Sequence, residues 1–347
     1  MKKKANRNRL FLGILTTLTV VLLALTVVGL VVFSLQVGAY EASGIDDYTT
    51  YTRLYAFIAN NSDSSVSDNL YQELREYGLQ NDCYVERIGD GLVANYSKSE
   101  LIDIAIKSKV SGIILEGDDT EETAALIAKA NAAGIPVITV MTDAPGTGRL
   151  SFIGMNNYSA GLEYGQLMLD AASGKDKDDI TALVLMSSSG SNESVLFSAI
   201  QEKLKNSSIT IDSVVVESDS AFSAEEKIID ILDEYKTLPD IIVCLSDINT
   251  RCAYQCIVDM NGVGVTTIIG YYDSDTVLEG IDRGAIEATF SVDTKQVAQY
   301  CVNALNEYFE YGNVSEYFGT DYVLINKGNV SGYIASELDM EAVDEEN

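Results

Sequence analysis

Histidine and cysteine, which commonly carry catalysis or bind metals, are absent or few in this sequence. It contains no histidine, which excludes Ser-His-Asp and Cys-His catalysis, imidazole metal sites and histidine-based pH switching. Its five cysteines include no Cys-x-x-Cys pair, so neither a zinc ribbon nor a thioredoxin-like redox motif is present. We expect the cysteines to be small buried residues of the core: Cys83, Cys244, Cys252, Cys256 and Cys301.

The acidic residues also form no recognisable catalytic or metal-binding pattern. Asp273, Asp275 and Glu279 resemble a calcium loop only faintly, because the central glycine is absent, and helix capping explains them better. Adjacent acids such as Asp118 and Asp119 suit glycoside hydrolysis in principle, but nothing places two carboxylates across one bond, and a solvated surface is the preferred interpretation. We therefore predict that the protein is not an enzyme and has no cofactor and no metal site.

The charge balance restricts the partners of the protein. Acidic residues outnumber basic ones by 52 to 23, which gives a formal net charge of −29 at pH 7. A surface with that field repels phosphate backbones, so we expect no nucleic acid among the partners.

A long apolar run follows the basic cytoplasmic segment that we predict at 1–10. Residues 11–40 contain no charge, and a helix of roughly 20 such residues is enough to cross the bilayer core. We interpret 11–40 as a retained transmembrane helix; the alternative is a signal peptide cleaved after Ala39. Positive charge on the N-terminal side predicts a single-pass protein of the cell membrane, with its N-terminus cytoplasmic and its binding region extracytoplasmic.

Beyond a polar stalk at 41–52, apolar runs typical of buried strands alternate with amphipathic segments of helix length. This alternation predicts an α/β fold in which parallel sheets are covered by helices on both faces. Because it occurs in two successive series, we expect two doubly wound parallel-sheet lobes. Ser97 with Glu100, and Ser223 with Glu226, have capping-box spacing and are predicted to begin helices. The expected strands lie at 54–60, 83–89, 111–117 and 135–141, and then at 180–187, 209–217, 240–246 and 266–272.

Much of the chain resembles the type I periplasmic sugar-binding proteins of the ribose-binding group, and the related ligand domains of the lactose-repressor family. The stretches that carry this likeness are SGIILEGDD at 111–119, AKANAAGIPVITVMTDAP at 128–145 and FIGMNNYSAGLEYGQLM at 152–168, followed by 238–255, 267–293 and 296–312. The likeness covers nearly all of 53–330 in the family's order. Repressors of the group carry a helix-turn-helix where this chain has the apolar run, which argues against DNA regulation.

The resemblance implies two lobes, joined by three crossovers, that close on a small ligand between the carboxyl ends of their strands. Open α/β sheets in general bind ligands at that edge. Hinges are expected near Gly154, Val292 and Asp321. The family pattern maps the first lobe to 53–154 plus 293–320, the second to 155–292 plus 321–336, and an acidic tail to 337–347.

The same resemblance assigns candidate ligand-binding residues. Phe222 matches the aromatic residue that stacks on the sugar in the family, and its alternative is a loop aromatic that covers the core. Asp247 matches the acid of an Asn-Asp pair, while Asn157 matches an asparagine that opens the crossover helix and is otherwise a plain N-cap. The full predicted set is Asn60, Asn61, Asp143, Asn157, Asn192, Phe222, Asp247 and Asp273.

Departures from the pattern of ribose binders argue against ribose itself. Met141, Tyr272 and Val292 stand where that pattern has Asp, Asp and Gln, and its arginine near 192–205 is replaced by Leu196 or a neighbour. Arg and Asp hold sugar hydroxyls through charge-assisted hydrogen bonds, so we expect a different ligand, a weaker sugar site or an altered pocket. Acids at the expected cleft mouth would discriminate against anionic ligands.

Two functions are consistent with these features. The first is a membrane-anchored extracytoplasmic solute-binding protein that closes on a small neutral solute, expected to be a sugar, and presents the closed state to an ABC permease or a membrane sensor kinase. The second is a protein-docking ectodomain whose sugar site has degenerated. A retained anchor raises the effective concentration of the protein near either membrane partner. It also limits how many sites one binder can serve by diffusion, which favours sensing.

Overall fold

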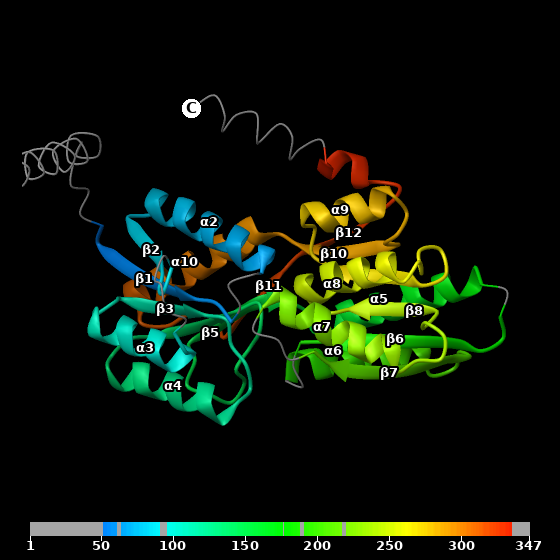
Figure 1. The fold of residues 1–347 in the computed structure, drawn as a ribbon. Helices are drawn as coiled ribbons and strands as arrows, with labels where there is room; N and C mark the ends of the chain where they lie inside the picture. The colour runs from blue at the N-terminus through cyan, green and yellow to red at the C-terminus, as the bar shows by residue number, and fades with distance from the viewer. Residues whose placement is uncertain are drawn as a thin grey trace, which may run out of the picture. The chain divides into compact units, whose positions relative to one another are not determined.

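Two six-stranded sheets form the framework of the protein (Figure 1). The first sheet is entirely parallel, and the second is parallel except for one edge strand. The computed structural model describes residues 51–60, 64–90, 96–175, 177–187, 191–216 and 220–334. The strand order is β11-β5-β4-β3-β1-β2 in the first sheet and β12-β10-β9-β8-β6-β7 in the second. Strand β12 is the exception, because it pairs antiparallel with β10. The predicted pair of parallel-sheet lobes is therefore present.

The first lobe is built from one continuous run of chain and two elements that return to it late in the sequence. It comprises β1 (Arg53–Ile58), α2 (Ser65–Gln80), β2 (Cys83–Arg87), α3 (Lys98–Lys107), β3 (Gly112–Leu115), α4 (Glu121–Ala132), β4 (Val137–Val140), β5 (Ser151–Met155), α10 (Thr294–Tyr311) and β11 (Tyr317–Thr320).

The second lobe repeats the same succession of strands and helices. It comprises α5 (Asn157–Ser173), β6 (Ile180–Met186), α6 (Ser191–Leu204), β7 (Ile209–Val215), α7 (Ala221–Asp233), β8 (Ile241–Cys244), α8 (Asp247–Asp259), β9 (Thr267–Tyr271), α9 (Asp275–Asp282), β10 (Ala288–Val292) and β12 (Tyr322–Asn326).

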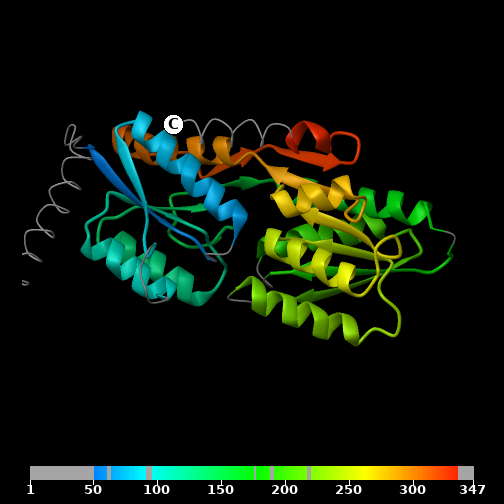
Figure 2. The ribbon, with the colours of Figure 1, turned by 45° about the horizontal axis from the view of Figure 1, so that its top comes forward.

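The strands are apolar on both faces because helices cover both faces of each sheet (Figure 2). In β1, Tyr55 and Phe57 are buried in the cluster formed with α2 and α10, whereas Ala56 and Ile58 are buried in the cluster formed with α3 and α4. Alternation of side chains along a strand produces this division. The second sheet has α5 and α6 on one face and α7, α8 and α9 on the other. All five cysteines are buried and free, as predicted.

Polar caps begin the helices at positions that the sequence predicts only in part. Ser97 and Glu100 form the predicted capping box of α3. The box predicted from Ser223 and Glu226 was wrong by three residues, because Ser220 is the N-cap of α7 and Ser223 is the residue that returns the hydrogen bond. A serine at the third helical position can act as the reciprocal acceptor, so local spacing alone does not separate the two registers.

Three crossovers connect the lobes in the described chain. Strand β5 leads into α5, β10 leads into α10, and β11 is followed after Asp321 by β12. Two of these crossovers are joined by side-chain bonds: Asp321 N–H donates to Gln296 Oε1 at 2.8 Å, and Gln296 Nε2 donates to Asp321 Oδ2 at 3.1 Å. Several parallel connections of this kind suit a hinge between two rigid lobes.

The predicted transmembrane run at 11–40 lies outside the described residues, as do residues 41–50 of the predicted stalk and the acidic tail at 337–347. In the part of the chain that the structure describes, no helix has both the length and the apolar composition needed to cross a bilayer.

Helices α5 and α6 approach each other closely at two glycines one turn apart. A Cβ atom on Gly161 would lie 2.4 Å from the Leu196 carbonyl oxygen and 2.7 Å from Ala199 Cβ. A Cβ atom on Gly165 would lie 2.6 Å from Lys203 Cβ. Because the nearest neighbours of Gly161 are backbone and Cβ atoms, they cannot rotate away to relieve the overlap.

The substitution Gly161→Ala is therefore expected to lower the free energy of unfolding by about 1–3 kcal/mol, the usual cost of overpacking. Gly174→Ala is the matched control, because Gly174 ends the same helix with a φ of −82° and its added Cβ would meet nothing closer than the Ala171 carbonyl oxygen at 3.6 Å. We expect the control to change stability by about 0.5 kcal/mol or less. Urea-induced unfolding measures both variants, and equal midpoints would contradict the close packing at Gly161.

Candidate functional site

Acidic residues directly follow several strands at the carboxyl edges of the two sheets. Glu116 follows β3 and Asp143 comes shortly after β4 in the first lobe, while Asp247 and Asp273 come shortly after β8 and β9 in the second. Parallel strands of one sheet end on the same edge, which is the usual position of ligand sites in open α/β sheets. The residues differ, however, in whether they face the other lobe.

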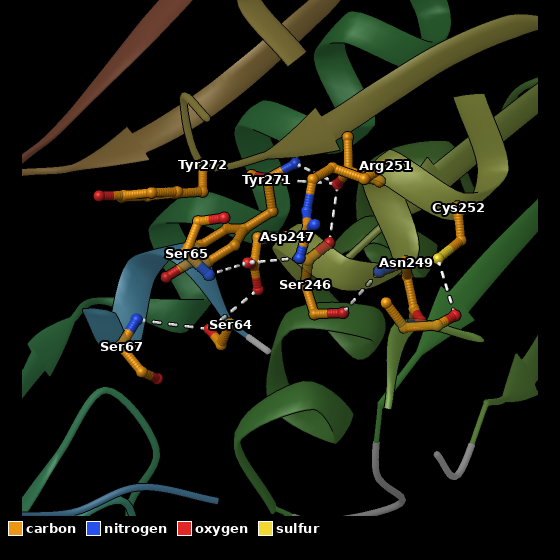
Figure 3. Close-up of polar contacts among 12 residues, drawn as sticks. Ser64, Ser65, Ser67, Ser246, Asp247, Asn249, Arg251, Cys252, Tyr271 and Tyr272 are labelled. Atoms are coloured by element: carbon orange, nitrogen blue, oxygen red, sulfur yellow. Dashed lines mark hydrogen bonds and ion pairs between the residues drawn. The ribbon is translucent and has the colours of Figure 1, made fainter. Parts of the chain in front are cut away.

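Asp247 joins the two lobes (Figure 3). It is the first residue of α8 and only 3% exposed. Its Oδ1 accepts a hydrogen bond from Ser64 Oγ at 3.1 Å, and its Oδ2 accepts one from Ser65 N–H at 2.7 Å, both at the start of α2. Arg251 places Nη2 3.7 Å from Oδ2. A carboxylate of the second lobe thus caps a helix N-terminus of the first lobe, where backbone N–H groups and the helix dipole favour an anion.

Glu116 is a buried acid that contacts the same turn of α2 from within the first lobe. Asn60 N–H donates to Oε2 at 2.8 Å, and Ser67 Oγ donates to Oε1. Glu116 therefore fixes the end of β1 and the first turn of α2 to the end of β3. It was not among the predicted residues, although its place directly after the buried run Gly112–Leu115 was a usable signal.

Burial raises the pKa of the carboxyl groups in this region. For Glu116, burial has the largest effect and the charge of Asp247 adds to it, while the hydrogen bond from Ser67 acts in the opposite direction. Burial likewise raises the pKa of Asp247 against the charge of Arg251, and it raises the pKa of Asp273. Burial thus destabilises the ionised form of each carboxyl group, and the negative charge of an anionic ligand would destabilise it further.

Tyr272 reaches from the second lobe to the first. Its hydroxyl accepts a hydrogen bond from Asn69 Nδ2 on α2 at 2.6 Å, and its buried ring belongs to the core cluster of the first lobe. Its φ is +71°, and Met141, after the equivalent strand β4, has a φ of +62°. Bulky residues seldom adopt positive φ, and such strain is concentrated at functional sites. Met141 and Tyr272 therefore occupy strained positions, one in each lobe.

The carboxylate of Asp143 accepts hydrogen bonds from groups of its own lobe, the first. Arg149 Nη2 donates to Oδ2 at 2.7 Å and Arg149 Nε donates to Oδ1, which also accepts from Thr139 Oγ1 and from Ala144 N–H, each at 2.8 Å. Four donors of its own lobe thus hold this carboxylate, and the predicted ligand contact of Asp143 stays a prediction.

Phe222 is the most accessible of the predicted side chains. It is the second residue of α7 and is 70% exposed. A loop aromatic that covered the core would be buried, so this alternative does not hold. A ring with both an exposed face and a position in the first turn of a helix is available to pack against an apolar surface of another molecule.

The predicted asparagines occupy different surroundings. Asn60 donates from Nδ2 to the Gly117 carbonyl oxygen at 3.2 Å, so it lies beside Glu116. Asn157 is the first residue of α5, but the capping role that the sequence allowed for it belongs to Asn156, whose side chain accepts from Ser159 N–H at 3.0 Å. Asn61 lies outside the described residues, as does the side chain of Asn192 in the first turn of α6.

The chain is similar to periplasmic binding proteins in sequence and fold. Residues 55–313 match the family model described as periplasmic binding protein domain. No curated protein sequence matches the chain. Similar solved structures include GanP, a glucose-galactose binding protein from Geobacillus stearothermophilus, with 20% identity over 80% of this chain and 98% of that chain and a TM-score of 0.70.

Two further solved structures share the fold. The XylFII-LytSN complex matches with 22% identity over 80% of this chain and 98% of that chain, at a TM-score of 0.67. An ABC transporter solute binding protein from Agrobacterium vitis, bound with α-D-tagatopyranose, matches with 17% identity over 80% of this chain and 96% of that chain, at a TM-score of 0.70. Identities this low establish a common fold and leave the ligand of this chain open.

The substitution Glu116→Gln is expected to change how stability depends on pH. The pKa of this carboxyl is raised above 4.5 by folding, so the folded state holds the proton more tightly than the unfolded state does. As the pH rises from about 4.5 through the pKa that Glu116 has in the folded state, the wild type should lose stability relative to the variant. The variant has no carboxyl proton to lose at this position. Denaturant unfolding between pH 4 and pH 8 measures this difference.

Glu226→Gln is the control for that comparison, because Glu226 is exposed on α7. Its stability curve should run parallel to that of the wild type. A wild-type curve that also runs parallel to that of Glu116→Gln would contradict the inferred burial of the Glu116 carboxyl.

Proposed function

Because the chain belongs to the periplasmic binding protein domain family, a family of non-enzymatic solute-binding proteins with the type I fold, we propose that it takes a small neutral carbohydrate between its two lobes. The observation that carries this proposal is the meeting of buried acceptors from both sheets at the first turn of α2. Phe222 in the second lobe supports it as well, because an exposed aromatic ring can pack against the apolar face of a sugar.

The chemistry of these residues favours a polyhydroxylated, uncharged ligand. Carboxylate oxygens accept hydrogen bonds from sugar hydroxyls, and such charge-assisted bonds are stronger than bonds between neutral groups. The raised pKa values of Glu116, Asp247 and Asp273 indicate that a further negative charge would be unfavourable here. Similar solved structures hold α-D-tagatopyranose or D-arabinose, which supports a sugar ligand for this chain.

We propose that the protein is anchored in the cell membrane by the apolar run at 11–40, with its lobes outside the cytoplasm. An anchored receptor has a high effective concentration near any membrane partner, but it can serve few sites by diffusion, so we favour a sensor kinase over an ABC permease. The XylFII-LytSN complex supports a protein partner for this fold.

The competing function is a protein-docking ectodomain with no solute. Two observations favour it: Asp247 is already bonded to the first lobe, and Met141 and Tyr272 stand where ribose binders have acids. In this case Phe222 would contact a protein instead of a sugar ring. A ligand screen separates the two functions.

A thermal-shift screen of the full chain in detergent, against monosaccharides, oligosaccharides, amino acids and nucleosides, is expected to show stabilisation by one class of sugar. A solute that binds only the native state at 100 times its Kd stabilises it by about 2.7 kcal/mol. For a protein of this size that corresponds to a rise in Tm of roughly 4–5 °C. No rise with any member of the panel would favour the docking function.

The substitution Phe222→Ala should abolish the rise in Tm for the sugar found in that screen and leave the ligand-free Tm nearly unchanged, because the ring is exposed. Tyr311→Ala is the control: Tyr311 is 64% exposed on α10 of the first lobe and should keep the full rise. An undiminished rise in the Phe222 variant would show that the ring is not part of the sugar site.

A further inference from the structure

The first turn of α2 is held between carboxylates from both lobes. Glu116 fixes the turn from within the first lobe through Ser67. Asp247 bonds the same turn from the second lobe through the Ser64 hydroxyl and the Ser65 N–H. The first N–H groups of a helix have no acceptor within the helix, so a carboxylate at this position supplies the acceptor that they lack.

Three protein donors hold the Asp247 carboxylate, and the residue is only 3% exposed. Beside Ser64 and Ser65, its carboxylate accepts a backbone hydrogen bond from Ile248 and faces Arg251 at 3.7 Å. A carboxylate offers about four acceptor positions. Because the carboxylate is buried where the lobes meet, a sugar hydroxyl can reach the remaining position only when the lobes part, and parting breaks the bonds from Ser64 and Ser65 of the other lobe.

A second bond supports the same contact. Asn69, exposed on α2, donates to the Tyr272 hydroxyl at 2.6 Å, and Tyr272 is held at a φ of +71°. Strained backbone persists only where the surroundings compensate for it. Burial of the Tyr272 ring in the core cluster of the first lobe is such a compensation, and it exists only while the lobes are together.

We propose that Asp247 is a positioning residue that holds the lobes together before any solute is bound. A solute can then bond to its carboxylate only after the hydrogen bonds from the start of α2 have broken. The ligand-free protein is then closed by its own contacts, with Asn69 and Tyr272 as the supporting pair. This role differs from the direct ligand contact proposed for Asp247, and a measurement without ligand tests it whether or not the solute is a sugar.

Distances between spin labels on the two lobes test the proposal in the full, detergent-solubilised chain without ligand. Glu122→Cys on α4 and Glu226→Cys on α7 provide exposed labelling sites, one in each lobe. The native cysteines are all buried, so the introduced thiols react selectively. The labelled protein should show a narrow distance distribution, and Asp247→Ala should shift it to longer distances.

Substitutions on α2 keep the test valid if Asp247→Ala does not fold. Asn69→Ala removes the exposed partner of Tyr272 and should shift the distribution in the same direction by a smaller amount. Gln80→Ala, at the other end of α2, removes an exposed bond to Glu76 and should leave the distribution unchanged.

Phe222→Ala separates closure by the protein from closure by a sugar carried through purification. If Asp247 holds the lobes, the Phe222 variant stays closed. Opening in that variant to the extent seen with Asp247→Ala would overturn the proposal, because the closed state would then depend on ligand. A broad, long-distance distribution in the wild type, or an unchanged one in the foldable Asp247 and Asn69 variants, would overturn it as well.

Discussion

The N-terminal turn of α2 receives carboxylates from two lobes, and the rest of the site depends on that arrangement. Buried carboxylates are costly unless hydrogen-bond donors surround them. Here the start of α2 supplies the Ser65 N–H and two serine hydroxyls, and the Asn60 N–H after β1 is a further donor to Glu116. Glu116 and Asp247 therefore have a reason to be buried, and the first lobe has a fixed surface to present to the second.

The two sheets place these acids through their shared topology. Each strand order puts the ends of the central strands at one edge, so that β3 and β8 carry Glu116 and Asp247 toward the same region. The bond between Gln296 and Asp321 ties two crossovers together without joining the acid-bearing loops. Movement at the crossovers would change the separation of the carboxyl edges while each sheet keeps its own register.

Local patterns were sufficient to predict the lobes and insufficient to predict the contact between them. Alternating apolar and amphipathic segments report burial within one sheet, and the capping box at Ser97 is a contact over three residues, so both can be read from sequence. The bond between Asp143 and Arg149 could not be predicted, because Arg149 follows in a loop whose path the pattern does not specify. The bonds of Asp247 to Ser64 and Ser65 span more than 180 residues, and Glu116 has no motif beyond its place after a strand. Such contacts depend on lobe packing, which periodicity does not encode.

The central claim is that a small solute replaces the N-terminus of α2 as the hydrogen-bond partner of the Asp247 carboxylate. A crystal structure with the stabilising solute bound tests it most directly. We predict a hydroxyl of the solute within about 3 Å of Asp247, and the Ser65 N–H no longer bonded to that carboxylate. A solute bound elsewhere, or one bound between the lobes while Ser64 and Ser65 still hold Asp247, would contradict the account.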